Sequence, residues 1–373
     1  MKKKVLFLIE SFIVGGAERA LLNLVNAMDK TRFDVTVISV FKESVYEGYN
    51  TKFSDSLSPE VHYRYLIDNT RKRQYLVFNY LFNKLPKSLF HRILIGSTFD
   101  TEVAFYEGLP TFFLAESSNK KSKKIAWLHY GDGFADSKGV KRDWYKKVYS
   151  KYDCIVGVSN GVCDNFRERV CEDFNVITRY NIFDDENVRI KANELKLKSE
   201  KRGSVQFVSV GRVCEVKGYD RLLRVCLKLH NEGFDFELNI VGGGECEQLM
   251  QFVSANSMQD YIHILGHMDN PYAIIKNADW LVCSSYAEGF STVMAESMII
   301  GTPVISTKCC STEELIGDDE YGLRCANSEE GLYDVLKKVL EDKSLTERYR
   351  KNAIQKGKCF SKNKLLSEIE ELF

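Results

Sequence analysis

The chain shows the same order of apolar and glycine-rich segments twice, and this repetition limits the folds open to it. In the first half, a compact apolar run at 5–10 is followed by a glycine pair and by apolar residues at helical spacing over 17–28. In the second half, the run 205–212 ends in Gly-Arg and precedes a helical pattern over 220–233. Mostly apolar strands that alternate with helices predict parallel sheets covered on both faces. The further expected strands are 34–40, 101–106, 124–130, 154–159, 175–180, 236–244, 261–266, 279–285 and 302–307.

Length and charge both indicate two domains. At 373 residues the chain exceeds the usual size of one domain. Residues 1–180 hold 28 Lys and Arg against 21 Asp and Glu, whereas residues 181–373 hold 24 against 31. We therefore expect two Rossmann-like, doubly wound α/β domains facing across a cleft, over 1–180 and 181–354. A C-terminal helix at about 355–373 is expected to pack back on the first domain, and the lysine-rich stretch 193–203 has the composition of a linker or a helix tail.

The composition is that of a globular protein that we expect to remain in the cytosol. The apolar run at the start ends at Glu10, too early for a signal peptide, and no stretch reaches the roughly 18–20 apolar residues of a membrane span. The 11 cysteines form no Cys-x-x-Cys pair and no metal-binding spacing, so we expect reduced thiols and no metal site. No nucleic-acid-binding module is recognisable, so the positive charge of the first half suggests an anionic membrane or an anionic substrate.

The stretch EGFSTVMAE, from Glu288 to Glu296, follows an expected strand and places two carboxylates around the start of a helix. Ser291 is the expected N-cap and Gly301 the expected helix end, so backbone N–H groups near Phe290 would form an anion site. A carboxylate accepts two hydrogen bonds from neighbouring hydroxyl groups, so this layout suits a sugar or a ribose beside a phosphate. A solvated pair of acids, one of them assisting the helix dipole, fits the same residues.

The stretch GRVCEVKG (211–218) places Arg212 at the end of a strand and Lys217 just before a helix. Two cations beside a helix N-terminus suit a diphosphate, because charge-assisted hydrogen bonds and the helix dipole both favour the anion. Two surface cations at a turn would give the same pattern.

Taken together and in this order, the motifs resemble the family 4 retaining glycosyltransferases of the GT-B fold, over nearly the whole chain. The matching segments of the second half are GRVCEVKG (211–218), VGGGE (241–245), EGFSTVMAE (288–296) and GTPVI (301–305). The first half adds SFIVGGAERALLNL (11–24), WLHYGD (127–132), VGVSNGV (156–162) and YNIFD (180–184). Two positions depart from the family: Glu245 stands where proline is frequent, and Asn181–Ile182 stands where an Asn-Gly turn is usual. Both departures bear on the shape of loops and leave the residues expected to carry the chemistry unchanged.

The resemblance implies roles toward a nucleotide-diphosphate sugar, with a UDP-sugar expected as co-substrate. Arg212 and Lys217 would neutralise the diphosphate, and Glu288 would hold hydroxyl groups of the transferred sugar. Glu296 would bind the ribose, and His129 would reach the donor sugar from the N-terminal domain, although a lone histidine is more often structural. The remaining donor-binding residues would be Gly16, Gly289, Phe290, Ser291 and Thr292.

The same resemblance implies a mechanism that retains the anomeric configuration and needs no metal or other cofactor. The acceptor would attack on the face from which the diphosphate leaves, and a donor phosphate oxygen would take the acceptor proton. The sequence has no Asp-x-Asp triplet of the kind that binds Mg²⁺ and a diphosphate. The two cations and the helix N-terminus would supply the electrostatic stabilisation instead.

The segment 71–93 mixes lysines and arginines with aromatic and aliphatic residues, and Lys120, Lys121, Lys123 and Lys124 form a second basic cluster. A basic, aromatic helix can lie in an anionic membrane interface. A helix whose apolar side packs on the sheet, with solvated cations, explains the segment equally well. An acceptor saccharide carried on a polyprenyl diphosphate or a glycolipid would place the enzyme at the inner face of the membrane, in surface polysaccharide or glycolipid synthesis.

Three other functions compete. A non-hydrolysing sugar-nucleotide epimerase shares the fold but needs further acid and base residues, which the sequence does not reveal, and it would act without an acceptor. A dinucleotide-dependent oxidoreductase is disfavoured because neither glycine cluster has the G-x-G-x-x-G spacing. A non-catalytic partner in polysaccharide assembly would bind the donor without turnover.

Overall fold

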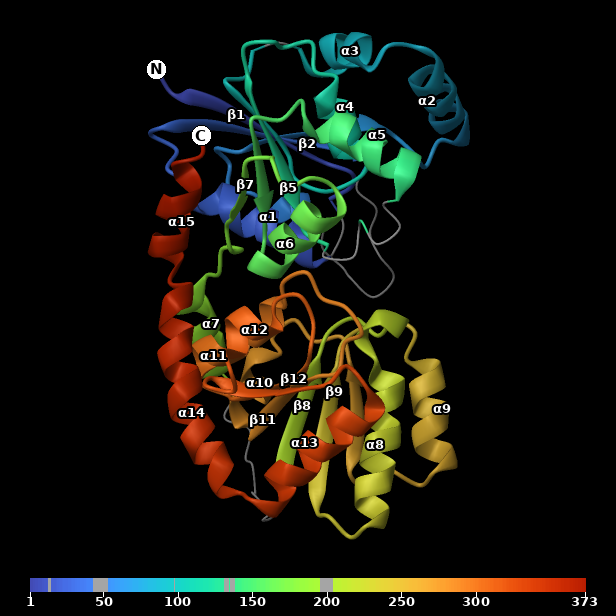
Figure 1. Cartoon of the computed structure of the whole chain (residues 1–373), viewed down its shortest axis with the longest axis vertical. Helices are drawn as coiled ribbons and strands as arrows, with labels where there is room; N and C mark the ends of the chain where they lie inside the picture. The colour runs from blue at the N-terminus through green and yellow to red at the C-terminus, as the bar shows by residue number, and fades with distance from the viewer. Residues whose placement is uncertain (13–14, 43–52, 97, 131–133, 135–137, 195–203) are drawn as a thin grey trace. The chain divides into compact units, whose positions relative to one another are not determined.

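The computed structural model describes residues 1–12, 15–42, 53–96, 98–130, 134, 138–194 and 204–373 of the chain. The chain forms two compact units (Figure 1), of which unit 1 comprises Met1–Ile182 with Asn363–Phe373 and unit 2 comprises Phe183–Lys362. The sequence placed the division at 180/181 and the returning helix at about 355–373. In the structure, α14 (Ser344–Gly357) stays with unit 2, and only the residues from 363 onward return to unit 1.

Unit 1 contains a seven-stranded parallel sheet with the strand order β3-β2-β1-β4-β5-β6-β7. The strands are β1 (Lys3–Ile9), β2 (Phe33–Phe41), β3 (His62–Ile67), β4 (Thr101–Ala104), β5 (Lys123–Leu128), β6 (Cys154–Gly157) and β7 (Val176–Thr178). Its helices are α1 (Gly16–Ala27), α2 (Lys72–Lys84), α3 (Lys87–Phe90), α4 (Leu109–Ala115), α5 (Gly139–Tyr149), α6 (Asn160–Arg169) and α15 (Lys362–Glu370), with helical turns at η1 (Phe53–Ser56) and η2 (His91–Ile95).

Residues 363–373 complete the core of unit 1. The ring of Phe373 packs edge-on against Phe7 of β1, with 5.5 Å between the ring centroids. The carboxylate of Glu370 accepts hydrogen bonds from the guanidinium of Arg32 at 2.8 Å and from the backbone N–H of Asp29 at 2.7 Å. The ammonium of Lys3 donates to the carbonyl of Phe373 at 2.9 Å. Both apolar packing and polar pairing therefore tie this segment to β1 and to the residues that precede β2.

Unit 2 contains a six-stranded parallel sheet with the order β10-β9-β8-β11-β12-β13. The strands are β8 (Val205–Val210), β9 (Phe236–Val241), β10 (Ile262–Gly266), β11 (Trp280–Cys283), β12 (Val304–Thr307) and β13 (Gly322–Cys325). The helical elements are α7 (Asp185–Ala192), η3 (Glu215–Lys217), α8 (Tyr219–Asn231), α9 (Glu247–Ala255), α10 (Tyr272–Asn277), α11 (Thr292–Ile300), α12 (Thr312–Ile316), α13 (Glu329–Glu341), α14 (Ser344–Gly357) and η4 (Lys358–Phe360).

The core of unit 2 follows from the apolar spacing of its helices. In α8, residues three and four positions apart such as Leu222, Val225 and Leu229 are buried, because they share one face of the helix. Trp280 of β11 is fully buried, and its indole N–H donates to the hydroxyl of Thr346 at 2.9 Å. The single polar atom of this large core side chain is thereby satisfied.

Every strand expected from the sequence is present, but two strands were missed. These are β3 and β13, which form edges of the two sheets. An edge strand has a neighbour on one side only, so it needs no continuous apolar run, and β3 (HYRYLI) indeed has no buried residue. The expected linker at 193–203 lies largely outside the described residues.

Each sheet has one place where the strand order reverses. In unit 1 the reversal lies between β1 and β4, and in unit 2 it lies between β8 and β11. In α/β proteins the loops that leave the carboxyl ends of the strands at such a reversal run in opposite directions, and ligands bind there.

Candidate active site

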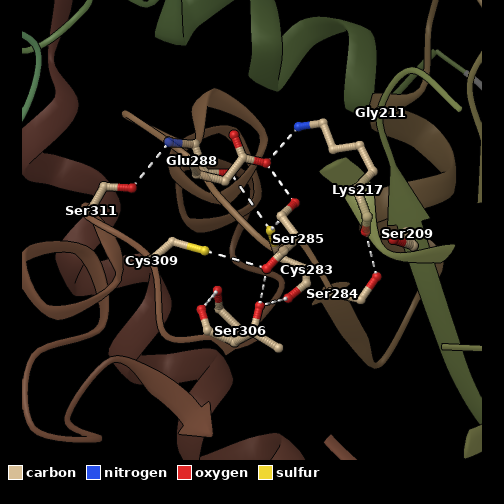
Figure 2. A network of polar contacts seen from close by, with 12 residues as sticks. Ser209, Gly211, Lys217, Cys283, Ser284, Ser285, Glu288, Ser306, Cys309 and Ser311 are labelled. Atoms are coloured by element: carbon tan, nitrogen blue, oxygen red, sulfur yellow. Dashed lines mark hydrogen bonds and ion pairs between the residues drawn. The ribbon is translucent and has the colours of Figure 1, made fainter. Parts of the chain in front are cut away.

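The loops after β8 and β11 bring together the residues that the sequence singled out in unit 2. Figure 2 shows Lys217, from the loop after β8, pointing toward Glu288, from the loop after β11. The two loops occupy the strand reversal of unit 2, so the structure places this pair where a ligand is expected.

Lys217 and Glu288 form a close ion pair. The Lys217 ammonium donates to Glu288 Oε1 at 2.5 Å, and the side chains are 25% and 13% exposed. The hydroxyl of Ser285 donates to the same oxygen at 2.6 Å. Burial is the largest influence on Lys217 and by itself would lower its pKa, but the charge of Glu288, the hydrogen bond to it and the nearby Cys283 and Cys214 together raise the pKa above the usual value of a lysine. Lys217 is therefore a permanent cation that already has an anionic partner.

Backbone contacts hold the two loops at a fixed separation. Gly218 has the left-handed conformation, with φ of 62°, and a Cβ at this position would lie 2.3 Å from the carbonyl oxygen of Ser284. The hydroxyl of Ser284 donates to the carbonyl of Lys217 at 2.9 Å. Only glycine combines this φ with this approach, which explains the Lys-Gly pair at the end of the first motif.

Arg221 of α8 contacts the loop after β11. Sequence analysis did not identify this residue. Its guanidinium is 2% exposed and donates to the carbonyls of Ser284, at 2.6 and 2.9 Å, and Ser285, at 2.9 Å. It also lies 4.0 Å from the ring centroid of Tyr286. In sequence Arg221 resembles a solvated helix cation, and no spacing distinguishes it from one.

Helix α11 begins and ends as predicted, with Ser291 as N-cap and Gly301 in the left-handed conformation at the end. The side chain of Ser291 makes no capping hydrogen bond, and its backbone N–H donates to the hydroxyl of Ser311 at 3.2 Å. Phe290 is buried, and its ring packs near Phe183 and Phe360. Phe290 therefore anchors the loop through its side chain and has only its backbone to offer to a ligand.

The remaining predicted residues of unit 2 flank this helix and strand. Glu296 lies a helical turn after Thr292, the first residue of α11, and its Oε1 accepts a hydrogen bond from the hydroxyl of Tyr272 at 2.9 Å. Arg212 follows Gly211 and is exposed, and within the described part of the chain its guanidinium has no ion pair. Of the two cations that the sequence predicted here, Lys217 thus has an anionic partner, and Arg212 has none among the described residues. Gly289 is buried in the loop between them and α11.

Two predicted residues, Gly16 and His129, belong to unit 1. Gly16 is the exposed first residue of α1, and a Cβ there would meet no atom within 4 Å. His129 directly follows β5, with its ring 4.7 Å from that of Phe105 and stacked at 5.9 Å on Tyr106. Burial lowers the pKa of His129 to about 3, so its imidazole is neutral.

Glu107 lies near His129, at the carboxyl ends of the strands of unit 1, and sequence analysis did not identify it. It follows β4, and its Oε1 accepts the backbone N–H groups of His129 at 2.7 Å and Tyr130 at 2.8 Å. Burial raises the pKa of Glu107 to about 7. The rule that pointed to Glu288, a carboxylate just beyond an apolar strand, applies to Glu107 after the expected strand 101–106 as well.

Two Rossmann-type parallel sheets, one of them with a charged pair at its strand reversal, define a class of protein, and known proteins agree with it. The crystal structure of Anabaena HepE in complex with UDP and glucose superposes with a TM-score of 0.76 at 17% identity, covering 99% of this chain and 98% of that one. The fold is therefore GT-B, as expected from the sequence.

The particular family follows from sequence similarity. The family described as glycosyl transferases group 1 matches residues 191–356, and the resemblance inferred from the motifs is thereby confirmed over this segment.

Two relatives come from Campylobacter jejuni. The first, N-acetylgalactosamine-N,N'-diacetylbacillosaminyl-diphospho-undecaprenol 4-alpha-N-acetylgalactosaminyltransferase, is 31% identical over 227 residues, which are 58% of this chain. The chain spans 59% of that relative's length. The second, GalNAc-alpha-(1->4)-GalNAc-alpha-(1->3)-diNAcBac-PP-undecaprenol alpha-1,4-N-acetyl-D-galactosaminyltransferase, is 26% identical over 379 residues, which cover 99% of this chain and 96% of that protein.

Proposed function

We propose that the protein is a retaining glycosyltransferase that moves a sugar from a nucleotide-diphosphate sugar, with UDP as the nucleotide, to a saccharide on a lipid-linked acceptor. The observation that carries the proposal is the Lys217–Glu288 pair at the strand reversal of unit 2, beside the N-terminus of α11. A cation, a carboxylate and a helix N-terminus at one edge match the diphosphate, the sugar hydroxyls and the phosphate oxygens of such a donor. Relatives named as transferases to undecaprenol-linked saccharides support the choice of acceptor.

The residues of unit 2 suggest a division of labour along the donor. Lys217 and Arg212 neutralise the diphosphate as it leaves, and Glu288 accepts hydrogen bonds from hydroxyl groups of the transferred sugar. Glu296 accepts hydrogen bonds from the ribose. The bond from the anomeric carbon to the phosphate oxygen breaks, the bond to the acceptor oxygen forms on the same face, and the acceptor proton passes to the departing diphosphate. No protein nucleophile or metal ion is required in this scheme.

Binding and transfer assays test this proposal. UDP should raise the melting temperature, because a ligand that binds only the folded state stabilises it by mass action. UDP-sugars should be consumed only when a polyprenyl-diphosphate-linked saccharide is present, and NMR of the product should show the donor's anomeric configuration. Consumption of the UDP-sugar by isomerisation without acceptor would instead identify an epimerase, and UDP binding with no turnover on any acceptor would identify an assembly partner.

Matched substitutions locate the donor. Lys217→Ala should lower kcat/KM by about 100- to 1000-fold, as for the loss of one strong electrostatic contact to a transition state. Glu296→Gln should raise the KM for the donor and leave kcat nearly unchanged, because a ribose contact is the same in the ground and transition states. Lys338→Ala, an exposed cation on α13 of the same unit, is the control. Equal effects of Lys217→Ala and Lys338→Ala would refute the placement.

We further propose that unit 1 docks on an anionic membrane surface through the basic-aromatic segment (71–93). The sequence left two alternatives for this segment, and the contacts of α2 favour docking. Phe78 is 4% exposed and packs on Phe41, whereas Leu76 and Tyr80 on the opposite side are 56% and 65% exposed. A helix that only covered a sheet would not need apolar side chains on its outer face.

Helix α5 extends this surface. Phe113 of α4 stacks on Phe82 of α2 with 5.8 Å between the ring centroids, and the neighbouring Phe112 packs against Trp144 of α5 at 4.5 Å. Trp144 is partly exposed on a helix that carries several lysines and one arginine. The second basic cluster contributes less than the sequence suggested, because Lys124 is buried and the ammonium of Lys123 donates to the carbonyl of Leu372. Within the described part of the chain, no helix is long and apolar enough to cross a bilayer.

Liposome sedimentation tests the docking proposal. Binding should increase with the fraction of phosphatidylglycerol and decrease as salt rises from 0.1 to about 0.5 M, because screening shortens the reach of the lysines and arginines. The double substitution Leu76→Ser and Tyr80→Ser should abolish binding, and Met250→Ser, an equally exposed apolar residue on α9, should not. Binding that ignores lipid charge, salt and the double substitution would contradict the proposal.

A further inference from the structure

Unit 1 has a ligand-binding geometry of its own, independent of unit 2. Its strand order reverses between β1 and β4, and in α/β sheets the carboxyl ends of the strands at such a reversal are where ligands bind. Glu107 stands at the end of β4 beside this reversal, and His129 stands at the end of the neighbouring strand β5.

The two oxygens of Glu107 have different surroundings. Oε1 accepts two backbone hydrogen bonds, from His129 and from Tyr130, and so fixes the path of the chain as it leaves β5. Oε2 is buried and, among the described residues, has no hydrogen-bond partner. Nε2 of the His129 imidazole is likewise buried without a partner in the described chain. Burying these two polar atoms at neighbouring strand ends without hydrogen-bond partners costs free energy. A purely structural arrangement would satisfy them.

The surroundings of Glu107 explain why its carboxyl group is not fully ionised at neutral pH. Tyr106 lies close to Glu107, and burial together with the charges of Glu107, Glu18 and Glu10 raises the pKa of Tyr106 to about 12. Burial raises the pKa of Glu107 to about 7, although hydrogen bonds from the backbone N–H groups of Tyr130, Glu107 itself and His129 oppose the rise. The titratable groups that interact with this carboxyl or border it are Tyr106 after β4, His129 and Tyr130 after β5, and Tyr149 on α5, while Glu10 after β1 and Glu18 on α1 act on the neighbouring Tyr106.

We propose that Glu107 is a substrate-binding residue, whose Oε2 accepts a hydrogen bond from a carbohydrate hydroxyl group while its Oε1 holds the backbone of His129 in place. This inference rests on the proposed transferase function. A sugar hydroxyl suits the site because it can donate to the Glu107 carboxylate or to the neutral imidazole nitrogen of His129, both of which are acceptors. A phosphate would be repelled by the acids around Tyr106. The hydroxyl can belong to the donor sugar or to the acceptor saccharide, and kinetics distinguishes the two.

The ionised carboxyl is the better acceptor, which gives the inference a pH signature. We expect kcat/KM for the bound substrate to rise about tenfold per pH unit below pH 7 and to level off above it. The substrate whose kcat/KM shows this inflection, donor or acceptor, is the one that supplies the hydroxyl. Glu107→Gln keeps an oxygen for the two backbone N–H groups but cannot ionise, so the chain path should survive and the inflection should disappear.

The experiment compares wild type, Glu107→Gln and the control Glu116→Gln, a half-exposed carboxylate of unit 1 that pairs with Lys151. Initial rates are measured from pH 5.5 to 8.5 with either substrate varied, and UDP binding is measured in parallel as a test of folded unit 2. We expect Glu107→Gln to lower kcat/KM at pH 8 for one substrate at least tenfold, without the inflection and with unchanged UDP affinity. Glu116→Gln should match wild type.

Two results would overturn the assignment while the transferase function stands. One is a Glu107→Gln enzyme within twofold of wild type at every pH, which is the outcome for a carboxylate that only holds the backbone. The other is a wild-type profile with no inflection near pH 7, and this measurement does not depend on the folding of any variant. A wild-type protein that binds UDP but transfers no sugar would instead refute the proposed function, and this assignment with it.

Discussion

Replacing Glu288 by glutamine should weaken catalysis and at the same time tighten the binding of free UDP. In the structure the Lys217 ammonium donates a hydrogen bond to Glu288 Oε1 at 2.5 Å. A diphosphate must compete with this carboxylate for the same cation. The glutamine cannot hold Lys217 electrostatically, so the ammonium becomes fully available to the diphosphate, while the hydroxyl groups of the donor sugar lose their ionic acceptor.

The magnitude follows from the geometry of the pair. Two unit charges about 4 Å apart interact by roughly 4 kcal/mol at an effective dielectric constant of 20. Partial exposure of both side chains and the persistence of part of the interaction in the complex leave about 1–2 kcal/mol to be gained. This corresponds to UDP binding that is roughly 5- to 30-fold tighter, since 1.4 kcal/mol is a factor of ten. The lost contact to the reacting sugar should lower kcat by about 100-fold or more.

The same substitution should cost stability. Lys217 would remain three-quarters buried without an anionic partner, and breaking one side of a partly buried pair removes roughly 1–3 kcal/mol from the free energy of unfolding. Titration calorimetry with UDP, steady-state kinetics with saturating acceptor and urea unfolding measure the three effects. Glu329→Gln, which breaks the exposed ion pair with Arg224, is the control and should leave all three unchanged within about 0.5 kcal/mol.

The outcome that refutes the reasoning is specific. If Glu288→Gln binds UDP more weakly than wild type, then Glu288 does not restrain Lys217 in the free protein or Lys217 does not meet the diphosphate. If kcat is unchanged while only the KM for the donor rises, Glu288 serves the ground state, and its assignment to the reacting sugar is wrong.

Four other results are expected. Arg221→Met should lower the free energy of unfolding by about 3 kcal/mol, because three hydrogen bonds to loop carbonyls are lost, and calorimetric UDP binding should weaken with it. Gly218→Ala should lower the melting temperature by several degrees through its positive φ and its approach to Ser284, whereas Gly233→Ala, also at positive φ but in open space, should cost less. Transfer should continue in EDTA, and a complete loss that Mg²⁺ or Mn²⁺ restores would show that the enzyme needs a metal. Because the pKa of Glu107 is higher in the folded chain than its usual value of 4.5, its contribution to stability is complete below pH 4.5 and is lost as pH rises through 7. Urea unfolding should therefore show Glu107→Gln gaining about 1–3 kcal/mol on wild type between pH 5 and pH 8.

Sequence reasoning worked where one physical signal determines a position, and failed where two distant segments must meet. Apolar strands that end in charged residues located Arg212, Lys217 and Glu288, because the carboxyl ends of parallel strands are loop positions. The direct pairing of Lys217 with Glu288 joins residues 71 positions apart in the chain. Nothing in either motif distinguishes an ion pair from two separate ligand contacts.

A local sequence pattern also fails to identify a residue whose role depends on its neighbours in the folded structure. Arg221 lies between Asp220 and Leu222 in α8, and its partners are carbonyls of the loop after β11, which is distant in the sequence. Ser291 shows the converse: its place as N-cap was predicted, but the hydroxyl of Ser311 takes up its N–H and its own side chain caps nothing. Position along an element can be read from a pattern, whereas the choice of partner depends on tertiary packing.

The return of residues 363–373 to unit 1 has a consequence for how the protein is made. Residues 363–373 are synthesised only after the whole of unit 2. Phe7 of β1 therefore lacks its packing partner Phe373 until synthesis reaches this segment. Unit 2, Phe183–Lys362, is contiguous in sequence and can fold while unit 1 is still incomplete. The unit that is translated first is therefore expected to reach its native core last. A nascent chain stalled before residue 363 should present a protease-resistant unit 2 and a protease-sensitive unit 1.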